Sequence, residues 1–167
     1  MNSNGMIRKN GTMFASLAVT VTLALVTFGA PAAWGQAGDG TRVDKPSRSS
    51  FSDTFKKLEA TLKAEHMMVV AKIDHKNMLS MVGAKIKGST TVEFGNPNMG
   101  KMLLPMDLAI GLEMPAKIYV YETSDNRVIV SFRKVAAQYA SYGNPEVAKA
   151  GEMMDMMLDK ITSAVTQ

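Results

Sequence analysis

Apolar residues recur at helical spacing in two stretches of this chain, one after residue 50 and one at the C-terminal end. Residues 52–64 carry Phe55, Leu58 and Leu62 three or four positions apart, with charged residues between them. Residues 145–165 repeat this spacing after an Asn-Pro pair that suits a helix start. An apolar stripe of this kind is typical of a helix that packs on one side. The pattern therefore predicts one helix near each end of the folded part.

Between these helices the pattern changes to short strand-like runs that end at turn residues. β-Branched and aromatic residues dominate four of them, at 67–74, 85–94, 116–122 and 127–133. The last two runs flank the turn residues 123–126, which predicts a hairpin.

The remaining segments are expected to be short helices or loops. The run 85–94 is halted by Gly-Asn-Pro, since proline disfavours helical backbone at the residue before it. We expect one or two helical turns at 78–82, a loop at 98–105, a short helical turn or a further loop at 106–112, and a short helix at 135–142.

Hairpin-linked strands between two helices indicate an α+β domain, with an antiparallel sheet covered by helices on one face. We assign this single domain to residues 51–167. Residues 38–50 are rich in Gly, Ser and charged residues, and are expected to be a flexible spacer or, around 41–44, a short edge strand.

Residues 1–37 have the composition of a signal peptide. Arg8 and Lys9 precede an uncharged apolar stretch at 13–29, and small residues ending at Ala37 offer a cleavage site. Cleavage there would leave 130 of the 167 residues and lower the net charge from +4 to +2, because it removes two cations and no acid. The sequence predicts a periplasmic or secreted protein without a membrane span after cleavage. A retained N-terminal membrane anchor is the alternative.

Composition excludes several classes of protein. The chain contains no cysteine, so it is neither a disulfide scaffold nor a lipoprotein and has no thiolate metal site. The domain that remains after cleavage is close to neutral and offers no basic groove for nucleic acid.

Several motifs together resemble the domain of unknown function 302 family. They follow the family's order over about residues 52–164 and comprise Ile73-Asp74-His75 with Asn77, Gly83, Phe94-Gly95-Asn96-Pro97, Gly100, Met114-Pro115-Ala116-Lys117 and the strands 118–122 and 128–132. The resemblance implies a TATA-binding-protein-like β-α-β-β-β-β-α fold, with its first strand near Val43, and implies no established activity. The chain departs from the family pattern at Lys101-Met102, Glu113-Met114 and Arg133-Lys134.

The most polar cluster expected at a strand end is Asp74-His75 with Asn77. The carboxylate could orient the imidazole as a base or a ligand. Alternatively, Asp74 caps the following helix and His75 bonds a loop carbonyl. No nucleophile or acid partner accompanies the pair, so the protein is expected not to be an enzyme, and a hydrolase or isomerase built on Asp74-His75 is held in reserve.

Methionine is unusually frequent, with 15 residues in the chain, of which 12 follow residue 37. The simplest interpretation is that methionine replaces leucine in the core, while methionines on loops would line an adaptable apolar pocket. Thioethers are also soft metal ligands. His75, Met78 and Met81 would share one helical face that could hold Cu(I), or a haem iron with one of the methionines.

These observations predict an exported, non-enzymatic domain that binds a small or apolar ligand. The predicted pocket residues are Asp74, His75, Asn77 and Asn96 as polar anchors, with Met78, Met81, Met102 and Met106 as apolar lining. The alternative is a periplasmic Cu(I) or haem carrier that uses His75, Met78 and Met81. A homodimer is left open.

Overall fold

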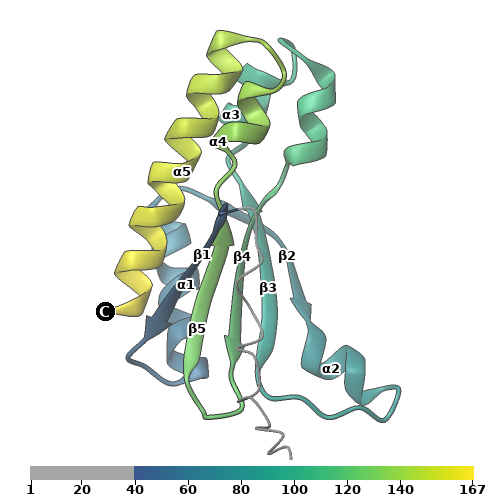
Figure 1. Cartoon of the computed structure of the whole chain (residues 1–167), viewed down its shortest axis with the longest axis vertical. Helices are drawn as coiled ribbons and strands as arrows, with labels where there is room; N and C mark the ends of the chain where they lie inside the picture. Colours follow the sequence, from purple (N-terminus) through teal and green to yellow (C-terminus); the bar gives the residue numbers. More distant parts are fainter. Residues whose placement is uncertain (1–39) are drawn as a thin grey trace, which may run out of the picture. The chain divides into compact units, whose positions relative to one another are not determined.

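The computed structural model describes residues 40–167, which contain a five-stranded antiparallel sheet (Figure 1). Its strands are β1 (Arg42–Ser47), β2 (Met68–Asp74), β3 (Ser89–Gly95), β4 (Ala116–Glu122) and β5 (Val128–Arg133). They lie in the order β1-β5-β4-β3-β2, so β1 and β2 are the two edges. The edge strand expected near Val43 is β1. The signal peptide predicted at 1–37 lies outside the described residues.

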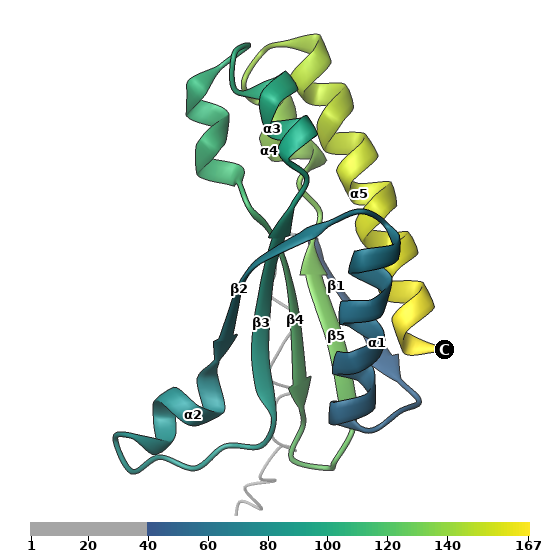
Figure 2. The same ribbon diagram turned by 180° about the vertical axis from the view of Figure 1, so that it is seen from behind.

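Residues 40–167 also form five α-helices and a 3-10 helix, of which the two long α-helices cover one face of the sheet (Figure 2). The α-helices are α1 (Phe51–Ala64), α2 (His75–Ser80), α3 (Pro97–Leu103), α4 (Ala136–Ala140) and α5 (Pro145–Thr166), with the 3-10 helix, η1, at Leu108–Glu113. The two long helices, α1 and α5, lie side by side against the sheet. The predicted α+β class and the order β-α-β-β-β-β-α are therefore confirmed. Within residues 40–167 no helix is both long and apolar enough to cross a membrane.

The main core lies between the sheet and the two long helices. Phe94, Ile118 and Val130 from the central strands pack with Leu58 of α1 and Leu158 of α5. A second cluster packs α3, η1 and α4 against the first half of α5, and consists of Leu103, Ile110, Tyr139, Val147 and Ala150. Burial of these side chains is the main force that holds the helices on the sheet.

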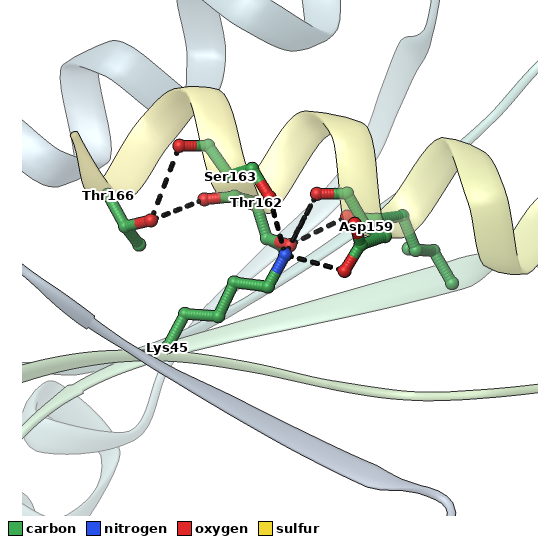
Figure 3. Close-up of polar contacts among 6 residues, drawn as sticks. Lys45, Asp159, Thr162, Ser163 and Thr166 are labelled. Carbon is green, nitrogen blue, oxygen red and sulfur yellow. Dashed lines mark hydrogen bonds and ion pairs between the residues drawn. The ribbon is translucent and has the colours of Figure 1, made fainter.

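A lysine on the edge strand β1 forms hydrogen bonds with α5. The Nζ of Lys45 donates to the Asp159 carboxylate at 2.7 Å, to the Asp159 carbonyl at 2.9 Å and to the Ser163 hydroxyl at 2.7 Å (Figure 3). An ammonium group has three protons, and all three have acceptors here. Thr162 and Thr166 instead bond to carbonyls of their own helix. Lys45 is therefore the polar link between this strand and the helix above it.

Three connecting segments differ from the sequence-based expectation. Residues 97–103 form α3 rather than a loop, because the Asn96 side chain accepts from the Asn98 N–H at 2.9 Å and Pro97 suits the first helical position. The same Asn-Pro pattern starts α5, so the signal was present in the sequence. Helix α2 begins earlier than predicted because Asp74 caps it, and β3 begins later, at Ser89.

The methionines are mostly not core residues. Of the 12 that follow residue 37, Met154 is buried and seven are exposed. The exposed ones are Met68, Met78, Met81, Met102, Met106, Met153 and Met156. The interpretation that methionine replaces leucine in the core is therefore wrong for most of them.

Candidate functional site

A pocket of about 510 Å³ lies where β4 begins after η1 and β5 ends before α4. Its apolar lining is Leu112, Pro115, Ala116, Phe132, Val135 and Leu158. Its polar lining is Arg42, Thr91, Glu113, Lys117, Tyr119, Ser131, Arg133 and Gln138. A cavity of this size, with an apolar wall and a few polar groups, has the dimensions of a small-molecule site.

The central row of this site follows from strand alternation and register. Along β4, Ile118 and Val120 point into the core, so Tyr119 lies on the opposite face. In the sheet, Tyr119 stands opposite Thr91 of β3 and Ser131 of β5. Three strands thus place an aromatic ring between two hydroxyl side chains.

One end of this row is fixed by an arginine–carboxylate pair. Arg42 donates to Asp44 from both Nε and Nη2, each at 2.9 Å, and Ser131 donates to the same carboxylate at 2.6 Å. Arg42 also donates to the Tyr121 hydroxyl at 3.0 Å. Two parallel hydrogen bonds of this type fix the orientation of the Arg42 guanidinium and place its positive charge against the Asp44 carboxylate. The hydrogen bond to Asp44 raises the pKa of Arg42, and burial raises the pKa of Tyr121 above its ordinary value.

The other end of the row reaches His75. The rings of Tyr119 and Tyr121 stack with centroids 4.9 Å apart, and the Tyr119 hydroxyl shares a 2.7 Å hydrogen bond with Ser89. The His75 ring meets Tyr119 edge-on at 5.8 Å, and its Nε2 shares a 2.8 Å hydrogen bond with Thr91. His75 therefore contacts two pocket residues without lining the pocket itself.

Charges around the pocket nearly balance. Lys117 forms a loose pair with Glu93 at 3.5 Å, and Arg133 donates to the Thr41 hydroxyl at 3.0 Å. The Glu113 carboxylate accepts from the Tyr142 hydroxyl at 3.2 Å. Three cations and three carboxylates lie in or beside the site, and they are Arg42, Lys117, Arg133, Asp44, Glu93 and Glu113. Such a site suits a mainly apolar molecule with one polar end better than a polyanion.

The polar anchors predicted from the sequence do not come together. Asp74 pairs with Thr90 at the start of β3, whereas Asn96 follows Gly95 at its end. A seven-residue strand separates them by roughly 20 Å. The predicted pocket that joins Asp74-His75 to Asn96 is therefore not formed.

These residues have structural partners instead. The Asp74 carboxylate accepts from the Asn77 N–H at 2.9 Å and caps α2 instead of bonding to the His75 ring. Asn96 caps α3. Met102 and Met106 are exposed and are not among the pocket residues. Ligand binding by any of these residues remains a prediction.

The proposed metal ligands lie on and just after α2. Met78 and Met81 are exposed, and the Nε2 of His75 is engaged by Thr91. In the part of the chain that the structure describes, no three His, Cys, Asp or Glu side chains are grouped to hold a metal ion. The Cu(I) or haem hypothesis stays a prediction, and the contacts described here do not favour it.

A family model described as domain of unknown function DUF302 matches residues 43–165. The chain belongs to the DUF302 family. The crystal structure of an uncharacterized conserved DUF302 protein from Bacillus stearothermophilus is similar, with a TM-score of 0.69 and 17% sequence identity. The match covers 75% of this chain and 98% of that chain. At this identity the likeness shows a shared DUF302 fold.

Curated relatives of this DUF302 chain include two proteins named as fluoride-specific ion channels. Fluoride-specific ion channel FluC 1 of Brucella suis biovar 1 (strain 1330) is 28% identical over 90 residues, which are 54% of this chain and 35% of the channel. FluC 1 of Brucella abortus biovar 1 (strain 9-941) is also 28% identical over 90 residues, which are 33% of that channel. This chain therefore spans about a third of the length of the curated relatives that it matches.

None of the pocket's lining residues is among the site residues predicted from the sequence. The alternation of Lys117, Tyr119 and Tyr121 with apolar residues was visible and indicated an amphipathic face, but nothing showed that this face lined a site. Arg42 and Ser131 are far apart in sequence and meet only through the pairing of β1 with β5. In this DUF302 domain the signal that could have pointed to the pocket is the presence of two tyrosines, Tyr119 and Tyr121, on the same face of β4.

Proposed function

We propose that this DUF302 protein is an exported, non-enzymatic domain that binds a small amphiphilic molecule at β4 and β5. The observation that carries the proposal is the pocket of about 510 Å³, which has an apolar wall and the row Thr91, Tyr119 and Ser131. An aromatic ring between hydrogen-bonding groups would hold a flat ligand in one orientation.

Lys117 and Gln138 are the polar groups best placed to meet such a ligand. Lys117 is largely exposed and only loosely paired, and Gln138 is exposed on α4. Both can donate to a carboxylate or hydroxyl without breaking a buried hydrogen bond. Ser131 and Arg42 are both bonded to Asp44, so they form part of the pocket wall and do not act as reacting groups. The chemistry favours a small aromatic acid or alcohol.

Saturation-transfer NMR of the full chain with 4-hydroxycinnamate and benzyl alcohol tests this binding. We expect saturable binding of at least one probe. Gln138→Trp should weaken this binding about tenfold or more, because the indole would fill the pocket. A tenfold loss corresponds to about 1.4 kcal/mol of binding free energy. Ala137→Trp is the matched control. Ala137 lies on the same helix, is also exposed and does not line the pocket, so the Ala137→Trp variant should bind the probe with an affinity near that of the parent. Absence of saturable binding, or equal effects of the two tryptophans, would contradict the proposal.

Export is supported by the composition of residues 1–37, with two cations, an apolar stretch and small residues before Gly38. Mass spectrometry of the protein recovered from a periplasmic fraction is expected to show a chain that begins at Gly38. Recovery of the uncleaved chain from the membrane fraction would instead identify the N-terminal segment as an anchor.

A further inference from the structure

A projecting arm follows β2 at the end of the sheet opposite α3 and α4 (Figures 1 and 2). We call residues 76–87 the α2 arm. They comprise most of α2 and the segment that leads toward β3, and every one of them is exposed. The arm is independent of the pocket, because none of its residues lines it.

The α2 arm is apolar to a degree that is unusual for an exposed segment. Its exposed apolar residues are Met78, Leu79, Met81, Val82 and Ile86, and the exposed fractions of Met81 and Val82 are 80% and 78%. Exposed apolar residues that cluster in this way mark interaction sites. Methionine is flexible and adapts to irregular apolar surroundings.

The charges of the arm all have one sign. It contains Lys76, Lys85 and Lys87 and no acidic residue. The Lys87 ammonium is held by the Ser124 carbonyl and the Asn126 side chain, whereas the side chains of Lys76 and Lys85 form no hydrogen bond or ion pair with any of residues 40–167.

Acidic residues near the base of the arm have other partners. Asp74, which precedes the arm, caps α2 through the Asn77 N–H. Asp125, in the turn that Lys87 contacts, pairs with Arg127 at 2.7 Å. The arm therefore presents apolar side chains flanked by two unpaired cations.

We propose that the α2 arm inserts its apolar side chains into a bilayer whose surface carries anionic lipid headgroups. A convex apolar segment with lysines beside it matches the interface of such a bilayer, where the apolar groups enter and the ammonium groups stay at headgroup level. A projecting arm offers no groove in which a peptide could lie. Pairing with a second copy along β2 is disfavoured, because that edge has a bulge at Val70.

Because the chain lacks cysteine, a single introduced thiol can report on the arm alone. The full chain carrying Met81→Cys, labelled with the environment-sensitive fluorophore NBD, is mixed with vesicles of phosphatidylcholine with or without phosphatidylglycerol. We expect a blue shift and a several-fold rise in emission with the anionic vesicles and little change with the neutral ones. Ala137→Cys, labelled in the same way at an exposed site on α4, should not respond.

A charge-removal pair tests the role of the lysines. In the Met81→Cys background, Lys76→Gln with Lys85→Gln should weaken vesicle binding roughly tenfold or more, since each lysine near an anionic surface contributes about 1 kcal/mol. Lys101→Gln with Lys149→Gln, at exposed positions on other helices, is the matched control and should have little effect. All variants share the same N-terminal residues, so these cannot account for a difference between them.

Four results would each overturn the proposal. They are an unchanged signal at residue 81, equal signals at residues 81 and 137, equal responses to neutral and anionic vesicles, and a shift that grows with protein concentration in the absence of vesicles. The last result would identify the arm as a contact between copies of the chain.

Discussion

Phe94→Ala is expected to lower the free energy of unfolding by about 3–5 kcal/mol, the largest effect that we predict for this protein. Phe94 is fully buried on the central strand β3 and packs in the main core under the two long helices. Truncation would remove a large apolar side chain and leave a cavity that a sheet paired on both edges of β3 cannot easily close. Urea denaturation followed by circular dichroism measures the change.

Leu108→Ala is the control for this substitution. Leu108 is also a large apolar residue, but 81% of it is exposed, so its truncation should change stability by no more than about 0.5 kcal/mol. If Phe94→Ala were as mild as Leu108→Ala, the packing of β3 against α1 and α5 would have to be different from that described here.

Gly151→Ala is expected to destabilise the protein by about 1–3 kcal/mol, although alanine is the better helix former. Gly151 lies in α5 where α4 crosses it. A Cβ at this position would lie 2.6 Å from the Tyr139 Cβ and 3.0 Å from the Ala136 Cα. Backbone and a fully buried tyrosine cannot move aside cheaply, so α4 would be pushed away from α5. The same denaturation experiment reports the loss.

The same substitution at Gly100 should have the opposite sign. Gly100 is within α3, and a Cβ there would meet nothing closer than the Leu104 Cδ1 at 4.0 Å. Gly100→Ala should therefore stabilise the protein by roughly 0.5–1 kcal/mol through helix propensity alone. Stabilisation by both substitutions would show that α4 does not press against Gly151.

The two proposals for this DUF302 domain concern separate surfaces. The pocket lies where β4 begins and β5 ends, with Leu158 of α5 in its lining, and the α2 arm projects from the opposite end of the sheet. Failure of the pocket experiment would leave the arm proposal intact, and the reverse also holds, since the two share no residue. If both succeed, the domain would take up a small amphiphile while held near an anionic bilayer.

Local sequence patterns predict the two long helices, the main strands and the face of each that enters the core. Alternation placed Tyr119 and Tyr121 opposite the core, helical spacing placed Leu58 and Leu62 within it, and Asn144-Pro145 marked the start of the last helix. These features are local, because the side-chain periods of strands and helices act within a few residues. The motif at residues 94–97 predicts the end of a strand, and its Asn96-Pro97 pair also carries the helix-start signal seen at Asn144-Pro145.

The contacts between distant residues follow from how the strands pair in the sheet. Pairing of β1 with β5 brings Arg42 and Asp44 beside Ser131, and the register of β3 separates His75 from Asn96 by the length of a strand. Register depends on contacts between distant segments, and the spacing within one segment carries no information about it. The exposure of the methionines also depends on distant contacts. The spacing of apolar residues within a helix does not show whether another element covers its apolar side. The candidate pocket therefore lies on strands beside Asp74-His75, ligand binding at Asp74-His75 stays a prediction, and the predicted fold is confirmed.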